Sequence, residues 1–136
     1  MSEDIAVKAL KFLLARAPRN DRVVDHSLRV GGQFDDMTAR TVGYLHDLVE
    51  DGHATDEEIG LLFGDEVQDL VYFLTREDDE TYYEYVRAIP LGGRIAVLVK
   101  LADLADNLRN MPKEKESLRP RYLEAQKFLR ESLADL

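Results

Sequence analysis

The stretch Thr41-Val42-Gly43-Tyr44-Leu45-His46-Asp47-Leu48-Val49-Glu50-Asp51 decides the fold that we expect for this chain. Val42, Leu45 and Val49 recur at the spacing of one helix face, so the segment from Thr41 to Val49 is predicted to be helical. Four ionisable side chains lie within and just beyond this apolar pattern. The stretch therefore predicts a core helix that also carries chemistry.

The ionisable residues of this stretch form two rows. His46 and Glu50 share one face of the predicted helix, and Asp47 and Asp51 share the adjacent face, because residues four apart overlay on a helix. Imidazole and carboxylate groups serve as metal ligands and as acids or bases. The two rows therefore predict a metal site or an acid/base site.

Outward from this stretch, apolar residues recur at helical spacing along the whole chain. We expect helices over Ile5 to Leu14, Met37 to Val49, Ile59 to Phe63, Asp65 to Leu74, Tyr82 to Ile89, Arg94 to Arg109 and Pro120 to Leu133. One more helix is expected to be capped by Asp21 and to run through Val23 and Val30 toward Gly31-Gly32. Pro90 is expected to interrupt the helix that begins at Tyr82. Val97 to Val99 alone would also suit a strand, but alternating strands with hairpin turns are absent from the sequence. The pattern predicts an all-α helical bundle of about seven or eight helices.

Thr55-Asp56-Glu57-Glu58 has the sequence of a capping box. In that motif the Thr55 side chain accepts from the backbone of Glu58, and the Glu58 side chain accepts from the backbone of Thr55. A short helix is therefore expected to begin after Thr55 and to end near Gly64.

Length and composition restrict the class of protein. The chain has 136 residues, which fit a single domain spanning 1–136, and no apolar run approaches the roughly 18 residues of a membrane span. The acidic N-terminus lacks a secretory pattern, so we expect a cytoplasmic protein. The formal charge of −9 argues against a nucleic acid polymer as partner. With no cysteine, a bound metal must use His, Asp, Glu or Asn.

Two histidines and two aspartates form the candidate metal-ligand set: His26, His46, Asp47 and Asp103. Each lies in a predicted helix beside apolar residues. Mixed nitrogen and oxygen ligands suit Mn, Fe, Zn, Ni or Co better than Ca, which prefers oxygen alone. Spacing alone leaves an alternative open, in which the histidines are hydrogen-bonded core residues and Asp47 pairs locally.

Longer motifs surround these four residues. The order H…HD…D resembles the HD-domain metal-dependent phosphohydrolases, and the flanking residues resemble their RelA/SpoT-type branch more closely. His46 to Asp51 is similar to the HDxxED segment of that branch, and Lys100 to Leu108 is similar to its KLADxxxNL signature. The segments 25–30 and 63–76 also resemble the family, so the similarity covers roughly Asp25 to Met111.

The resemblance implies a reaction and a role for each matching residue. RelA/SpoT-type hydrolases remove the 3′-pyrophosphate of guanosine alarmones such as ppGpp, a small-molecule nucleotide substrate, and typically use manganese. By resemblance, His26, His46, Asp47 and Asp103 bind the divalent metal. Glu50 and Asp51 position and activate water, and Asn107 contributes to the nucleotide pocket.

Further residues near these motifs suit phosphate binding. Lys100 and Arg109 are candidate contacts for phosphate, because anionic substrates need cations, although a solvated structural role is an equal alternative. Asp106 competes with Asp103 as a ligand; the motif favours Asp103, which leaves Asp106 as a salt-bridging surface residue. One of Tyr82, Tyr83 and Tyr85 could stack on a base, although a core role is the more common one for such tyrosines.

The sequence departs from the family before the first histidine. The family carries a basic segment with a Pro-Tyr pair there, whereas this chain has Arg16-Ala17-Pro18-Arg19-Asn20-Asp21-Arg22. Substrate identity is therefore less well specified than reaction type. We expect a small stand-alone hydrolase with the option of a homo-oligomer. An HD-type 5′-nucleotidase, a cyclic-nucleotide phosphodiesterase and a non-catalytic nucleotide-binding module are the alternatives.

Overall fold

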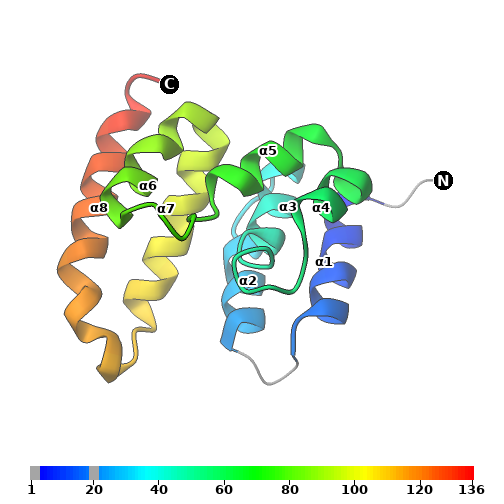
Figure 1. Cartoon of the computed structure of the whole chain (residues 1–136), viewed down its shortest axis with the longest axis horizontal. Helices are drawn as coiled ribbons and strands as arrows, with labels where there is room; N and C mark the ends of the chain where they lie inside the picture. Colours follow the sequence, from blue (N-terminus) through cyan, green and yellow to red (C-terminus); the bar gives the residue numbers. More distant parts are fainter. Residues whose placement is uncertain (1–3, 19–21) are drawn as a thin grey trace.

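The computed structural model describes residues 4–18 and 22–136, and it is helical throughout (Figure 1). Its described residues form eight α-helices and two short 3₁₀ helices, with no strand. The elements are α1 (Ile5–Arg16), α2 (Arg22–Gly32), α3 (Met37–Leu45), α4 (Asp56–Phe63), α5 (Asp65–Phe73), α6 (Tyr82–Ala88), η1 (Ile89–Gly92), α7 (Arg94–Arg109), η2 (Lys113–Leu118) and α8 (Arg119–Leu133). The predicted all-α class and helix number are confirmed.

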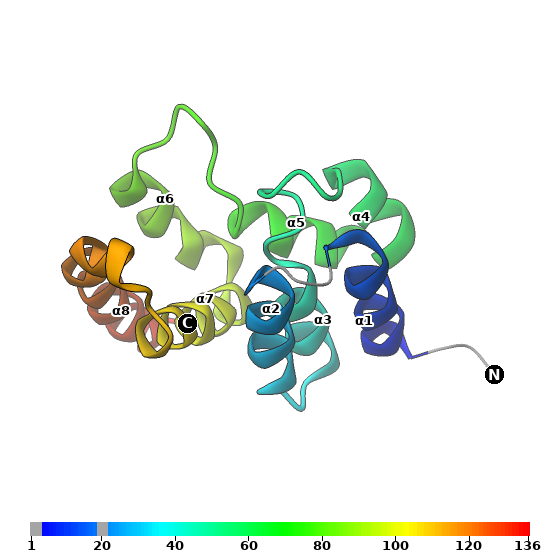
Figure 2. The ribbon, with the colours of Figure 1, turned by 90° about the horizontal axis from the view of Figure 1, so that it is seen from below.

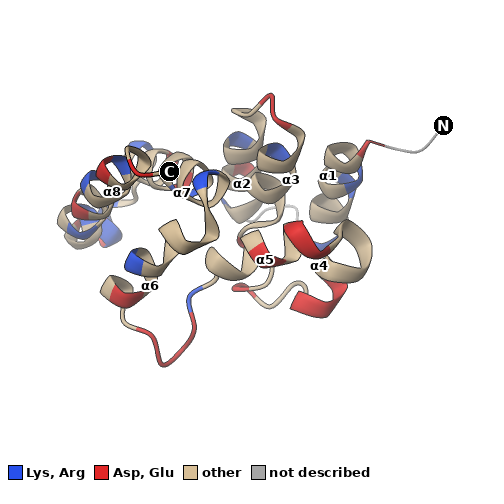
Figure 3. Ribbon diagram, turned by 90° about the horizontal axis from the view of Figure 1, so that it is seen from above, with Lys and Arg blue, Asp and Glu red and all other residues tan. Residues whose placement is uncertain are grey.

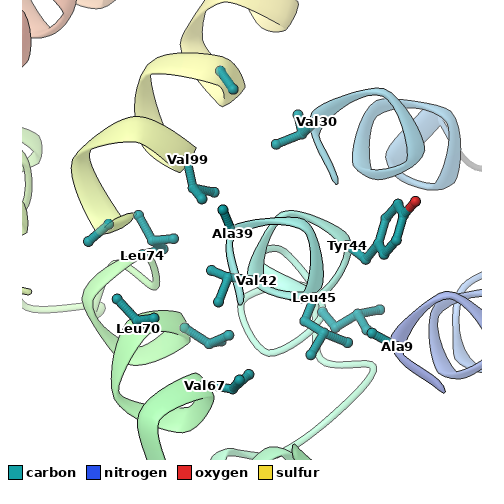
Figure 4. Close-up of a cluster of buried hydrophobic side chains, with 14 of the residues drawn as sticks. Ala9, Val30, Ala39, Val42, Tyr44, Leu45, Val67, Leu70, Leu74 and Val99 are labelled. Atoms are coloured by element: carbon teal, nitrogen blue, oxygen red, sulfur yellow. The ribbon is translucent and has the colours of Figure 1, made fainter. Parts of the chain in front are cut away.

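Helix α3 lies at the centre of one half of the molecule. It packs against α1, α2, α5 and α7. In Figure 4 the side chains of Ala39, Val42 and Leu45 extend from α3 into a cluster that neighbouring helices complete. All three are nearly or fully buried, with exposed fractions of 2% or less. Burying a Val or Leu side chain stabilises a fold by roughly 1.5–3 kcal/mol, so the segment that carries His46 is firmly anchored.

Two glycines bring α2 and α3 into backbone contact. A Cβ atom added to Gly43 would lie 2.6 Å from the Cα of Gly31 and 2.8 Å from its backbone nitrogen. A Cβ on Gly31 would in turn collide with the ring of Tyr44. Side chains larger than hydrogen would push the two helices apart, so the glycine pair sets the close approach of the elements that carry the two predicted histidine ligands.

Helix α7 joins the two halves of the molecule. Figure 2 shows α1 to α5 on one side and α6 and α8 on the other, with α7 between them. Helix α7 contacts α2, α3, α5 and α8. It runs unbroken from Arg94 to Arg109, as predicted, so the apolar run Val97 to Val99 is helix and not strand. Its central residues therefore face both halves.

The prediction that the helix of the opening stretch continues to Val49 is wrong. Helix α3 ends at Leu45, and residues 46–52 form consecutive turns. The backbone N–H of Leu48 donates to Leu45 O at 3.1 Å, and that of Asp51 donates to Asp47 O at 3.0 Å. The chain thus stays locally coiled without forming a regular helix. In this segment Asp47 contacts His26 of α2, and His46 contacts Asp103 of α7.

Local motifs account for several helix ends. The predicted capping box is confirmed: Glu58 N donates to Thr55 Oγ1, and Thr55 N donates to Glu58 Oε1, both at 3.2 Å. Pro90 ends α6 as expected, but the chain continues through a 3₁₀ turn from Ile89 to Gly92. Whether Asp21 caps α2 lies outside the described residues.

Charge is unevenly distributed over the surface. Figure 3 shows acidic residues gathered on α4 and on the loop between α5 and α6. Basic residues are frequent on α8 in the same view. Within the described residues, no helix combines the length and apolar character that crossing a membrane requires.

Candidate metal centre

Three segments far apart in sequence bring the four predicted ligands together. His26 lies on α2, His46 and Asp47 directly follow α3, and Asp103 lies on α7. Their candidate ligand atoms all lie within 4.8 Å of one another. The pair His46-Asp47, adjacent in sequence, contributes two of the four groups because both side chains turn toward Asp103 where α3 ends.

Short contacts define the centre of this cluster. The Nε2 atom of His26 lies 2.7 Å from Asp103 Oδ1 and 3.6 Å from Asp47 Oδ2. The Nε2 atom of His46 lies 3.2 Å from each of the same two oxygens. One nitrogen from each imidazole and one oxygen from each carboxylate therefore converge on a common point.

Both imidazole rings are held by the nitrogen that faces away from the cluster. His46 Nδ1 donates to the backbone carbonyl of Gly43 at 2.7 Å, and His26 Nδ1 contacts Asp106 Oδ2 at 2.6 Å. A carbonyl only accepts, so His46 Nδ1 carries a proton. Metal-binding histidines commonly use this arrangement, in which Nε2 remains to bind the ion. The donor set and its outer contacts therefore fit a divalent transition metal such as manganese or zinc.

Charges and hydrogen bonds within the cluster shift the pKa values of its members. Burial by itself would raise the pKa of Asp103, but the charge of Lys100 and the hydrogen bonds from both histidines hold that pKa well below its usual value. Burial would lower the pKa of His46, whereas the neighbouring charge of Asp47 and a hydrogen bond to Asp103 raise it well above the ordinary value. The carboxylates are therefore ionised and can serve as anionic ligands.

The predicted phosphate-binding residues lie at different depths. Lys100 is buried, and its Nζ donates to Asp103 Oδ2 at 2.8 Å while lying 5.0 Å from the ring centre of Tyr85. Asn107 Nδ2 donates to Asp103 Oδ1 at 3.2 Å. Both residues line the cavity over the cluster, whereas Arg109 is exposed and is not part of that lining.

The two residues of the predicted acid pair, Glu50 and Asp51, line the same cavity. The backbone N–H of Arg76 donates to Glu50 Oε1 at 2.8 Å, which holds the carboxylate in place. Burial raises the pKa of Glu50; the hydrogen bond from Arg76 lowers it, and the charge of Asp47 adds to the rise. A carboxyl group with a raised pKa is a better proton acceptor near neutral pH.

Known proteins share this fold and part of this sequence. No family model matches the chain. It is 35% identical over 106 residues to the guanosine-3′,5′-bis(diphosphate) 3′-pyrophosphohydrolase MESH1 of Xenopus tropicalis, over 69% of this chain and 58% of that protein. It is 32% identical to a GTP pyrophosphokinase of Myxococcus xanthus, over 68% of this chain and 15% of that protein. A solved structure of a metazoan ortholog of SpoT that hydrolyses ppGpp superimposes with a TM-score of 0.78, covers 98% of this chain and 87% of the other, and shares 24% sequence identity.

The chain belongs to the RelA/SpoT-type HD domains. The matched region spans little more than half of the Xenopus protein and a small part of the bacterial one. Membership thus extends to the fold and to the motifs around the ligand cluster.

The cavity of this RelA/SpoT-type domain is large enough for a nucleotide. Its volume is about 690 Å³, within the range of small-molecule sites. Several cations line it together with the acid pair: Arg22, Arg29, Arg76, Lys100, Lys115 and Arg121. Tyr82, Tyr85 and Tyr122 add aromatic surface. The cavity thus combines positive charge for phosphates with rings that can contact a base.

Sequence reasoning missed the far wall of the cavity. Lys115 lies in η2, and Arg121 and Tyr122 lie at the start of α8. These residues follow the last family motif. In the sequence alone, Lys115 and Arg121 resemble ordinary solvated side chains, and Tyr122 resembles an apolar residue of the last helix. Only the return of α8 along α7 places them opposite the ligand cluster.

The prediction that Asp106 is a surface residue is wrong. It is 1% exposed, although it does form the expected salt bridge, with Arg29. Of the three tyrosines, Tyr82 and Tyr85 line the cavity, whereas Tyr83 is 63% exposed and is not among the lining residues.

Proposed function

We propose that this RelA/SpoT-type HD domain is a metal-dependent hydrolase that removes the 3′-pyrophosphate of guanosine alarmones such as ppGpp. One observation carries the proposal: the four-ligand cluster and the acid pair Glu50 and Asp51 open into one cation-lined cavity. A structural cluster of buried histidines would need neither the acid pair nor the cations. The Xenopus relative is named as a guanosine-3′,5′-bis(diphosphate) 3′-pyrophosphohydrolase, which supports the proposal.

The metal and compartment belong to the same proposal. A divalent ion held by His26, His46, Asp47 and Asp103 would lower the pKa of a bound water and offset charge on phosphate oxygens. Manganese suits the mixed nitrogen and oxygen donors, and the resemblance favours it. A cytoplasmic location is part of the same proposal.

Glu50 is the proposed general base. It accepts a proton from the attacking water as the water oxygen adds to the phosphorus attached to the ribose 3′-oxygen. The bond between that phosphorus and the 3′-oxygen then breaks, and the 3′-oxygen takes up a proton from solvent, which gives GDP and pyrophosphate from ppGpp and water. The hydrogen bond from the Arg76 backbone fixes one Glu50 oxygen, so the carboxylate has a defined orientation. Asp51 lies in the same wall and orients the water.

The cations and Tyr82 form the proposed substrate site. Arg76 and Arg121 lie 5.9 and 4.8 Å from the ring centre of Tyr82, so two guanidinium groups gather at one side of the cavity. The Tyr82 hydroxyl is buried and lacks a hydrogen-bond partner among the described residues. A phosphate oxygen would satisfy it, and the guanidinium groups would balance the phosphate charge.

Lys100 and Asn107 have a second role in this proposal. Both hydrogen-bond to Asp103, so they orient a ligand carboxylate in addition to facing the substrate. Arg109 is omitted from the proposed site because it does not line the cavity.

A substrate panel tests the function. Protein loaded with Mn²⁺ is incubated with ppGpp, pppGpp, nucleoside 5′-monophosphates and cyclic nucleotides, and products are separated by anion exchange. We expect pyrophosphate from the two alarmones only, and no product after Asp47→Asn. Asp65→Asn removes an exposed carboxylate that is outside the cavity lining and should leave turnover unchanged.

Other outcomes of the panel assign the alternatives. Release of orthophosphate from 5′-monophosphates would indicate a nucleotidase, and opening of cyclic nucleotides a phosphodiesterase. Binding of ppGpp to the loaded wild-type protein without any product would indicate a non-catalytic module. Each of these results would overturn the proposed reaction.

A further inference from the structure

Asp106 is a buried carboxylate behind the candidate ligand His26. Its side chain is 1% exposed, and its Oδ2 lies 2.6 Å from His26 Nδ1. Its Oδ1 accepts from Arg29 Nε at 2.7 Å, and Asn110 Nδ2 lies 3.3 Å from the same oxygen. A buried carboxylate with this many partners is held in one orientation, because each hydrogen bond fixes the direction of one of its oxygens.

Arg29 forms a bidentate ion pair with Asp106. Its Nε donates to Asp106 Oδ1 at 2.7 Å, and its Nη2 donates to Asp106 Oδ2 at 3.1 Å, so the carboxyl group is paired as an anion. An ionised carboxylate only accepts hydrogen bonds, so the proton in the short contact belongs to His26 Nδ1. The other ring nitrogen, Nε2, is then the atom with a lone pair for a metal ion.

Without Asp106 the His26 ring would have a competing arrangement. Its Nε2 lies 2.7 Å from Asp103 Oδ1, and it could donate a proton to that oxygen instead. A proton on Nε2 would exclude a metal from the same nitrogen. An acceptor on the Nδ1 side of the ring shifts the balance toward the metal-binding tautomer.

His46 has an acceptor at the same position of its ring. Its Nδ1 donates to the carbonyl of Gly43, an acceptor that the backbone of α3 supplies. His26 has an aspartate in the corresponding place, on the helix that also carries Asp103. The same chain segment therefore supplies one candidate ligand and the group that orients another.

We propose that Asp106, held by Arg29, is a positioning residue that fixes the Nδ1–H tautomer and the ring orientation of His26, so that His26 Nε2 faces a divalent metal. Asp106 is not itself a ligand, because its two oxygens are engaged by His26 and Arg29 on the far side of the imidazole ring. This inference rests on the metal-dependent function proposed above for the identity of the site. It concerns metal binding, which can be measured without turnover.

The first test is metal affinity. Mn²⁺ is titrated into metal-free protein and the free ion is followed by electron paramagnetic resonance. Loss of an outer-shell partner typically weakens metal binding by about 10–100-fold, which is the loss we expect for Asp106→Ala. Asp106→Asn keeps an oxygen acceptor and should retain part of the affinity. Glu58→Gln disrupts a similar bidentate pair with Arg16, outside the cavity lining, and should bind Mn²⁺ like the wild type.

The second test observes the tautomer. In Zn²⁺-loaded protein with ¹⁵N-labelled histidine, the wild type should show a slowly exchanging Nδ1–H signal for His26 and a metal-bound Nε2. That proton signal should be lost in Asp106→Ala and retained with a shift in Asp106→Asn. Circular dichroism establishes which variants fold, and Asp106→Asn decides the question if the alanine variant does not.

The outcomes separate this inference from the proposed function. Wild-type affinity and an unchanged His26 signal in a folded Asp106 variant would overturn the inference, whatever the protein hydrolyses. Wild-type protein that binds Mn²⁺ tightly, loses affinity on Asp106 substitution and yet hydrolyses no alarmone would overturn the proposed function and support the positioning role.

Discussion

Replacing Gly43 by alanine tests the contact that brings α2 and α3 together. The added Cβ would lie 2.6 Å from Gly31 Cα, 2.8 Å from Gly31 N and 3.2 Å from the carbonyl carbon of Val30. All three are backbone atoms, so no side-chain rotation can relieve the overlap. The helices must separate, and His46, three residues after Gly43, must move relative to His26.

The expected cost follows from two opposing effects. Alanine is favoured over glycine inside a helix by about 1 kcal/mol. Overpacking a buried contact costs roughly 1–3 kcal/mol, and backbone overlap belongs at the upper end of that range. We therefore expect Gly43→Ala to reduce the free energy of unfolding by about 1–2 kcal/mol, the difference between overpacking and helix propensity. Affinity for Mn²⁺ should fall as well.

Urea denaturation of metal-free protein, followed by circular dichroism, measures the stability change. Gly32→Ala is the matched control, because a Cβ at Gly32 meets nothing within 4 Å. That variant should be as stable as the wild type or more stable by up to about 1 kcal/mol. If Gly43→Ala is also as stable as the wild type and binds Mn²⁺ equally well, the close contact does not position the two histidines.

Three further predictions concern chemistry and stability. Glu50→Gln should lower kcat for ppGpp by about 10²–10⁴-fold, which is the typical contribution of a general base, with little change in Mn²⁺ affinity. Steady-state kinetics measure this effect, and a kcat within a few-fold of wild type would show that Glu50 is not the general base. In metal-free protein, burial lowers the pKa values of His26 and His46, but the nearby aspartates outweigh burial and raise both values above the usual 6.5. The stability that the two charged histidines contribute is therefore fully present below about pH 6.5 and should be lost as the pH rises through their folded-state pKa values. Thermal melting in EDTA measures this change, and stability that increases with pH above about 6.5 would contradict the prediction. Thr55→Ala should lower the free energy of unfolding by about 0.5–2 kcal/mol through loss of the capping box, whereas Thr55→Ser should retain most of it; equal urea midpoints for the two variants would refute the capping contribution.

The helices were predictable because their apolar periods and end signals agree. The range Arg94 to Arg109 matches α7, and the capping box at Thr55 marks the start of α4. The end of α3 was not predictable from the apolar pattern, since Leu48 and Val49 continue the period through residues that the structure shows as turns. Contacts of His46 and Asp47 with α2 and α7, which the linear pattern does not contain, hold that segment.

Some residues of the candidate site could be predicted from the sequence, and others could not. The four ligand positions were predicted because each belongs to a motif with a specific order and spacing. The motif favours Asp103 as the ligand and leaves Asp106 without a role of its own, so the sequence predicts a surface residue there. The ion pair of Asp106 with Arg29 joins two helices, which the linear pattern does not contain. No local sequence signal marks Arg121 or Tyr122 as a residue of the cavity. Their place in the cavity depends on how α8 packs against α7, which is a property of the whole fold.

The identity of the product tests the central claim most directly. Mn²⁺-loaded protein is mixed with ppGpp and the reaction is followed by ³¹P nuclear magnetic resonance, with metal-free protein and Asp103→Asn run in parallel. The account predicts equal amounts of GDP and pyrophosphate from the loaded wild-type protein and no product from the other two. Orthophosphate as the product, or an unchanged ppGpp spectrum with the loaded wild-type protein, would contradict it.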